Sequence, residues 1–175
     1  MTNRRAKYTA AHVSNYILRY FHVNKKEITH LKLQKLLYIA YGWNLVLNKE
    51  HPRLFDESIQ AWKLGPVIPS VYYYYKGEWE ITNYIYSGEE QNPILSIKED
   101  DYNTINIVNA VINCYGNKDA MDLVEIVHKK NSPWDKIYNR NGPATGANQP
   151  LNDDEIKKRC LPAIENFLNK SQDNL

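Results

Sequence analysis

The sequence predicts a mainly α-helical, compact domain with a small antiparallel β ribbon. In most of the longer segments, apolar residues recur at spacings of three and four, which is the period of one helix face. Residues that favour helix N-caps, such as Thr, Ser and Asp, stand directly before those segments. Two short segments, residues 58–64 and 80–86, instead alternate apolar and polar residues as a half-exposed strand does.

Two strong helical patterns follow one another near the N-terminus. Thr9 is a suitable N-cap for a first helix that we expect to end at about Asn24. After a short polar turn, Thr29 caps a second helix that extends to about Leu47. Its apolar residues cover more than one stripe of the helix surface. This predicts a central helix that is buried on several sides, or one with a face reserved for a partner.

The expected ribbon lies between the second helix and the middle of the chain. Residues 58–64 form its first strand, which Gly65 and Pro66 interrupt. A short helix is expected from Pro69 to Lys76, because proline is tolerated in the first turn and Gly77 follows the end. Residues 80–86 then alternate, and we expect them to pair with the strand that contains Trp62.

The second half of the chain is expected to be helical apart from one irregular segment. Acidic residues or serine mark the helix starts, where they interact favourably with free backbone N–H groups. The first of these helices is expected to begin between Ile97 and Asp101 and to end at Gly116. The next two are expected to begin at Asp119 and at Ser132, and the last is expected to run from about Asn152 to about Asn169. Residues 140–150 are rich in Gly, Pro and Asn, which predicts a loop.

The composition describes an ordinary globular protein. A length of 175 residues is typical of one domain, and we expect a single unit with flexible ends at about residues 1–7 and 171–175. Hydrophobic residues make up 43% of the chain, which is enough to form a core. The formal net charge of +2 is too small to indicate a polyanionic partner. Because no stretch resembles a secretory signal or a bilayer span, we expect a cytoplasmic location without membrane contact.

Three sequence blocks resemble a known family. Residues 29–47 read THLKLQKLLYIAYGWNLVL, residues 61–67 read AWKLGPV, and Ser132-Pro133-Trp134 follows later. The combination resembles the Panacea domain, a family that includes SocA-like antitoxins and phage-associated GepA proteins, and the resemblance covers most of the chain. It implies a small helical antitoxin that neutralises a cognate toxin by direct contact. One family member resembles an adaptor that hands its toxin to an ATP-dependent protease, so a protease is a second implied partner.

Exposed aromatic residues are the predicted partner-binding surface. Four consecutive tyrosines cannot all face inward, because successive helical residues turn by roughly 100°. Tyr and Trp are favoured as binding anchors, and a rigid Gly-Pro bend presents side chains at little ordering cost. The predicted contact residues are Trp62, Lys63, Tyr72, Tyr73, Tyr75 and Trp79. The alternative is structural: Trp62 anchors the core beside the turn, and the tyrosines pack half-buried with their hydroxyls in water.

No pattern indicates catalysis, a metal site or a cofactor. The five histidines lack a second ligand at a metal-binding spacing, and neither Cys114 nor Cys160 has a sequence setting that activates a thiol. We therefore expect a protein that is not an enzyme.

A DNA-binding regulator is the main rival hypothesis, since two helices joined by a short turn also begin a helix-turn-helix. The basic residues near those helices are Arg4, Arg5, Lys7, Lys25, Lys26, Lys32 and Lys35. We prefer a solvated basic face, because the second helix is too apolar to leave one side free for a groove.

Overall fold

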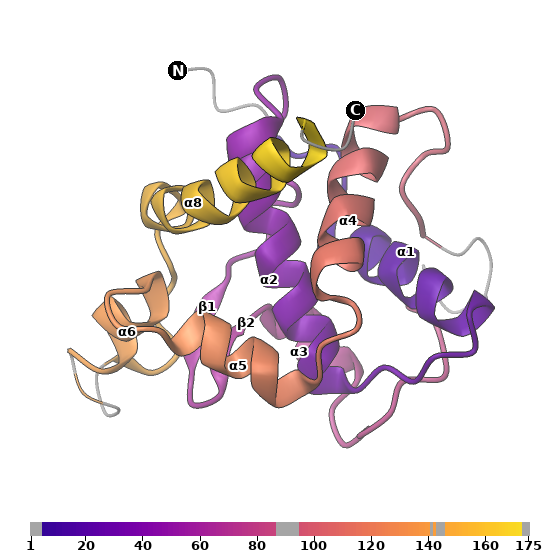
Figure 1. Cartoon of the computed structure of the whole chain (residues 1–175). Helices are drawn as coiled ribbons and strands as arrows, with labels where there is room; N and C mark the ends of the chain where they lie inside the picture. The colour runs from indigo at the N-terminus through magenta and orange to yellow at the C-terminus, as the bar shows by residue number, and fades with distance from the viewer. Residues whose placement is uncertain (1–4, 87–94, 141, 143–145, 173–175) are drawn as a thin grey trace.

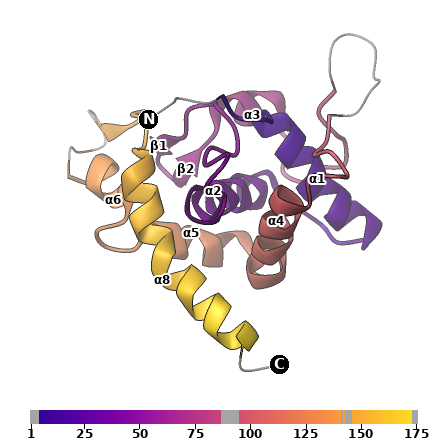
Figure 2. The same cartoon turned by 90° about the horizontal axis from the view of Figure 1, so that it is seen from above.

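The computed structural model describes residues 5–86, 95–140, 142 and 146–172. Helix α2 (His30–Leu47) runs through the middle of the molecule, and the other elements surround it (Figures 1 and 2). To one side of α2 lie α1 (Ala10–Val23) and α4 (Tyr102–Tyr115), and to the other lie the two strands and α6 (Pro133–Tyr138). The remaining helices are α3 (Pro69–Tyr74), α5 (Ala120–His128) and α8 (Asp153–Gln172). The mainly helical fold class is confirmed.

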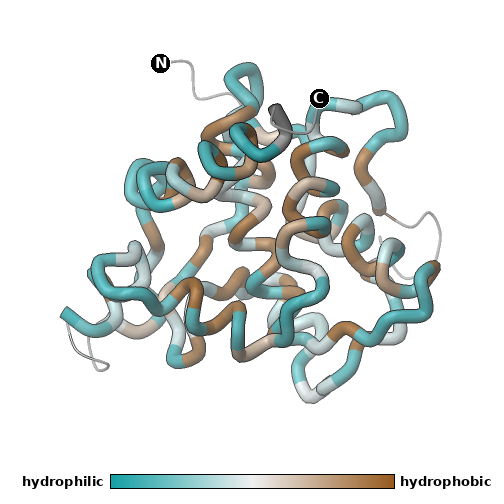
Figure 3. The backbone as a smooth tube through the Cα atoms, viewed as in Figure 1, coloured by the Kyte–Doolittle hydropathy of each residue, from teal (hydrophilic) through white to brown (hydrophobic). Residues whose placement is uncertain are grey.

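The central position of α2 explains its unusual composition. Every residue from 33 to 45 is buried, so the helix has no solvated face along this stretch. In contrast, hydrophobic residues recur at intervals along the surrounding helices, whereas the connecting loops are mainly hydrophilic (Figure 3). This is the pattern of amphipathic helices packed around a buried one.

Close packing between α2 and α8 depends on Gly42. A Cβ atom at this position would lie 2.4 Å from the Cys160 Sγ atom and 3.1 Å from the Ile156 Cγ2 atom. Because no side chain fits in this space, glycine sets the distance between the two helices.

Four of the predicted helix starts are confirmed by side-chain caps, whereas α1 begins after Thr9 without a side-chain cap bond. In each of the four an oxygen of the N-cap side chain accepts a hydrogen bond from the backbone N–H three residues later. The caps are Thr29 to Lys32, Asp101 to Thr104, Asp119 to Asp122, and Ser132 to Asp135. These local bonds fix where α2, α4, α5 and α6 begin.

The β ribbon exists, but its predicted pairing is wrong. Strand β1 (Gln60–Trp62) pairs antiparallel with β2 (Gly65–Val67), and Trp62 lies opposite Gly65. Gly65 has a φ of +102°, a conformation that lets the chain turn back at once, so the Gly-Pro pair opens a strand instead of ending one. The segment expected as partner, residues 80–86, forms a bridge from Glu80 to Thr29 and buries Ile81 and Ile85 in the core.

Candidate functional site

The three sequence blocks meet at the turn between β1 and β2, here called the hairpin corner (residues 62–66). The Lys35 ammonium group donates a hydrogen bond of 2.8 Å to the Pro66 carbonyl oxygen. The Trp134 indole N–H donates to the Trp62 carbonyl oxygen at 2.7 Å. Just beyond the corner, the Ile68 N–H donates to the Gln34 side-chain oxygen at 2.8 Å. Side chains from α2 and α6 therefore hold the corner from two directions.

Lys35 is the most unusual residue of this group, because its side chain is completely buried. Burial lowers the pKa of Lys35 to about 7, since a charged ammonium group loses its water shell in the interior. Lys35 was counted among the basic residues of a possible DNA-binding face, and this assignment is wrong. Its amine points inward to Pro66, where no phosphate can reach it.

A stack of aromatic rings includes the Trp134 indole that bonds to the corner. The His128 and Trp134 rings are parallel to within 3°, with centroids 3.6 Å apart, and the Tyr138 and Trp134 rings stack with centroids 5.0 Å apart. Burial and the nearby Lys35 lower the pKa of His128 to about 4, so the imidazole is neutral at pH 7. The stack fixes the Trp134 indole that bonds to Trp62.

The outer side of the corner carries an aromatic patch, defined as Trp62, Tyr72 and Tyr73. The centroid distances are 4.6 Å between Trp62 and Tyr72, 6.2 Å between Trp62 and Tyr73, and 5.5 Å between the two tyrosines. Trp62 and Tyr72 are half-buried, whereas Tyr73 is 62% exposed. Lys63 and Leu64 are exposed at the turn itself. The structure thus brings four of the six predicted contact residues together: Trp62, Lys63, Tyr72 and Tyr73.

The other two predicted contact residues lie elsewhere. Tyr75 is fully buried and donates a hydrogen bond to the Asn83 carbonyl oxygen at 3.1 Å, so its expected exposure is wrong. The reason is the phase of α3, which turns Val71 and Tyr75 together toward the core and leaves the tyrosine at position 74 exposed. Trp79 is 81% exposed, but none of the ring contacts among the described residues joins it to the patch.

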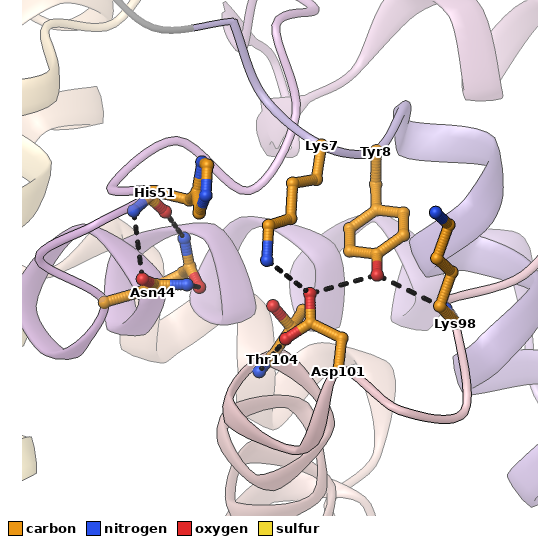
Figure 4. Close-up of polar contacts among 8 residues, drawn as sticks. Lys7, Tyr8, Asn44, His51, Lys98, Asp101 and Thr104 are labelled. Atoms are coloured by element: carbon orange, nitrogen blue, oxygen red, sulfur yellow. Dashed lines mark hydrogen bonds and ion pairs between the residues drawn. The ribbon is translucent and has the colours of Figure 1, made fainter.

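A second polar cluster ties the N-terminal segment to α4 (Figure 4). The Asp101 carboxylate accepts hydrogen bonds from the Tyr8 hydroxyl at 3.0 Å and the Thr104 N–H at 3.2 Å, and pairs with Lys7 at 3.3 Å. Burial opposes the ionisation of Asp101, but these hydrogen bonds outweigh it and lower the pKa of the carboxyl group. Asp101 therefore links the N-terminal segment to the start of α4. In the same view, the Asn44 amide donates to the His51 carbonyl oxygen at 2.8 Å.

The His, Cys, Asp and Glu side chains with defined positions form no group of three or more that could hold a metal ion. Among the helices built from those residues, none combines the length and apolar character needed to cross a bilayer.

A family model and a known protein match this chain. The model of the family described as "Antitoxin SocA-like, Panacea domain" matches residues 33–135, which include most of α2, the hairpin corner and the start of α6. Antitoxin SocA of Caulobacter vibrioides (strain NA1000 / CB15N) is 34% identical over 138 residues, covering 75% of this chain and 71% of that protein. No solved structure matches. The chain therefore belongs to the SocA-like family of antitoxins that is defined by the Panacea domain.

Proposed function

We propose that this chain is an antitoxin that neutralises a cognate toxin protein by direct binding through the aromatic patch. Membership in an antitoxin family supports the role. The observation that carries the choice of surface is the cluster of Trp62, Tyr72 and Tyr73 rings beside the hairpin corner, in which Tyr73 is the exposed member. Large aromatic side chains supply most of the binding energy at protein interfaces when they are grouped near the centre of a contact.

The rigidity of the corner adds to this argument. The corner is held by Lys35 and Trp134. In β1, the Ala61 N–H donates to the Gln149 carbonyl oxygen at 2.8 Å, and the Ala61 carbonyl oxygen accepts from the Asn148 N–H at 2.8 Å. A surface that is already ordered loses little conformational entropy when a partner binds. We infer that the corner acts as a preformed platform, and that the exposed Lys63 beside the patch contributes to partner choice through its charge.

The DNA-binding alternative is not favoured by the position of α2. His30, Leu33, Gln34 and Lys35 in its first turns are buried against the rest of the protein. A recognition helix needs these early positions to reach base edges. The protease-adaptor alternative stays open as a variant of the same proposal, since an adaptor also has to bind the toxin.

Growth of cells that express the cognate toxin tests the proposal. The parent chain should restore growth, and the double variant Trp62→Ala with Tyr73→Ala should not, at equal levels of soluble protein. Repeating the assay in cells without the major ATP-dependent proteases separates the two modes. Rescue in those cells means occlusion, and loss of rescue together with toxin accumulation means delivery. Full rescue by the double variant would contradict the proposed surface.

A further inference from the structure

A cleft beside α2 is not used by the proposed antitoxin surface. It has a volume of about 300 Å³ and is lined by residues of α2, α4, α5 and α8. Tyr38, Trp43 and Tyr115 supply an aromatic floor, and Lys129 and Arg159 supply positive charge. This volume lies at the small end of the range for ligand pockets, and the mixture of an apolar wall with few polar groups is typical of them.

The Tyr38 hydroxyl is the first sign of a built site. Tyr38 is only 3% exposed, yet its hydroxyl forms no hydrogen bond with any described residue. Among the described residues, the fully buried side-chain nitrogen and oxygen atoms that lack a hydrogen-bond partner are His51 Nδ1 and His128 Nε2. The Tyr38 hydroxyl is not one of them, and Tyr38 is among the residues that line the cleft. A buried hydroxyl without a protein partner is free to donate to a ligand.

The second sign is the unbalanced charge. Arg159 lines the cleft, and its positive charge partly offsets the burial that raises the pKa of Tyr38, of Tyr115 and of the Cys160 thiol. It forms no ion pair or hydrogen bond with the described residues, and no carboxylate stands among the residues that line the cleft. A guanidinium group of this kind matches the planar geometry of a carboxylate.

The remaining polar groups act as donors and not as nucleophiles. Burial raises the pKa of the Cys160 thiol to about 12, and it raises the pKa of Tyr38 and of Tyr115 above the ordinary value of a phenol. All three groups are therefore protonated at neutral pH. The cleft offers hydroxyl and guanidinium donors beside aromatic rings.

We propose that this cleft binds a carboxylate carried on an apolar body. The carboxylate pairs with Arg159 and accepts a hydrogen bond from the Tyr38 hydroxyl, while the apolar part packs on Trp43 and Tyr115. A free organic acid and the C-terminal residue of a peptide present the same chemistry. The site lies apart from the aromatic patch, so this inference does not depend on the proposed antitoxin surface.

Calorimetric and NMR titration of the full chain with 3-phenylpropionate tests the proposal. The neutral alcohol 3-phenylpropanol has the same ring and chain length, and we expect it to bind about tenfold more weakly because it cannot pair with Arg159. Peptides that end in Phe with a free carboxylate or with an amide distinguish the two sources. Tighter binding of the free-carboxylate peptide than of phenylpropionate identifies a chain end, and the reverse order identifies a small acid.

Two substitutions and one control make the test specific. Arg159→Gln should reduce phenylpropionate affinity about tenfold. Tyr38→Phe should reduce it about threefold to tenfold without loss of thermal stability, because the hydroxyl has no partner in the protein. Lys157→Gln removes an exposed charge from the same helix and should change nothing. No saturable binding of either acid, or equal binding to the parent and Arg159→Gln, would overturn the proposal.

Discussion

Lys35 and Pro66 join the centre of the protein to its surface, through a hydrogen bond of 2.8 Å from a fully buried amine to a backbone carbonyl oxygen. The bond links α2, on which the whole core is assembled, to the hairpin corner that carries the aromatic patch. Gly65 lies directly against the same amine, because a Cβ atom there would be 2.9 Å from the Lys35 Nζ atom.

The buried amine should make stability depend on pH. The folded protein holds the pKa of Lys35 at about 7, whereas the unfolded chain has the ordinary value near 10.5. Between these values the unfolded state binds more protons, so the free energy of unfolding rises as the pH rises. One such group contributes at most about 1.4 kcal/mol per pH unit. Urea unfolding between pH 7 and 8.5 should show this rise, and Lys35→Met should flatten it. An unchanged slope in the variant would contradict the assigned pKa.

Gly65 should tolerate alanine poorly for two separate reasons. Its φ of +102° strains any residue with a Cβ atom, and the added methyl group would collide with Lys35. Gly77 is a matched control, because it has a φ of +95° but no atom within 4 Å of the added Cβ. We expect Gly77→Ala to cost about 1 kcal/mol and Gly65→Ala about 2 to 4 kcal/mol in chemical denaturation. Equal losses would mean that the contact with Lys35 is unimportant.

A larger residue at position 42 should disturb the packing of α8 against α2. The Cys160 Sγ atom would lie 2.4 Å from the new Cβ atom, so Gly42→Ala should destabilise the protein by about 1 to 3 kcal/mol. Cys160→Ala removes that sulfur atom and should recover part of the loss when the two changes are combined. A double-mutant cycle measured by thermal unfolding gives the coupling between the two positions. Strictly additive effects would show that the two residues do not touch.

Much of the fold was predictable because its determinants are local. Thr29, Asp101, Asp119 and Ser132 cap helices by bonds that span three residues, so the sequence alone indicates where those helices start. The central position of α2 was predictable from its lack of polar faces.

The strand pairing, the phase of the short helix α3 and the contact that buries Lys35 were not predictable from the sequence. The strand pairing was wrong because residues 60–62 find a partner only a few residues away, through the turn at Gly65. Tyr75 was misplaced because α3 is too short for its apolar period to show which tyrosine faces inward. One sequence feature indicated that Lys35 is buried, because it is the only cation between residues 33 and 47. Only the hydrogen bond to Pro66 explains how the buried amine is accommodated.

We expect the aromatic patch beside the hairpin corner to bind the toxin. Isothermal titration of purified cognate toxin with the parent chain, Tyr73→Ala and Tyr102→Ala tests it most directly. The control residue Tyr102 is 70% exposed, comparable to Tyr73 at 62%, but lies at the start of α4. We predict that Tyr73→Ala weakens binding about tenfold or more, while Tyr102→Ala binds like the parent. Parent-like affinity of Tyr73→Ala, or an equal loss in both variants, would contradict the claim.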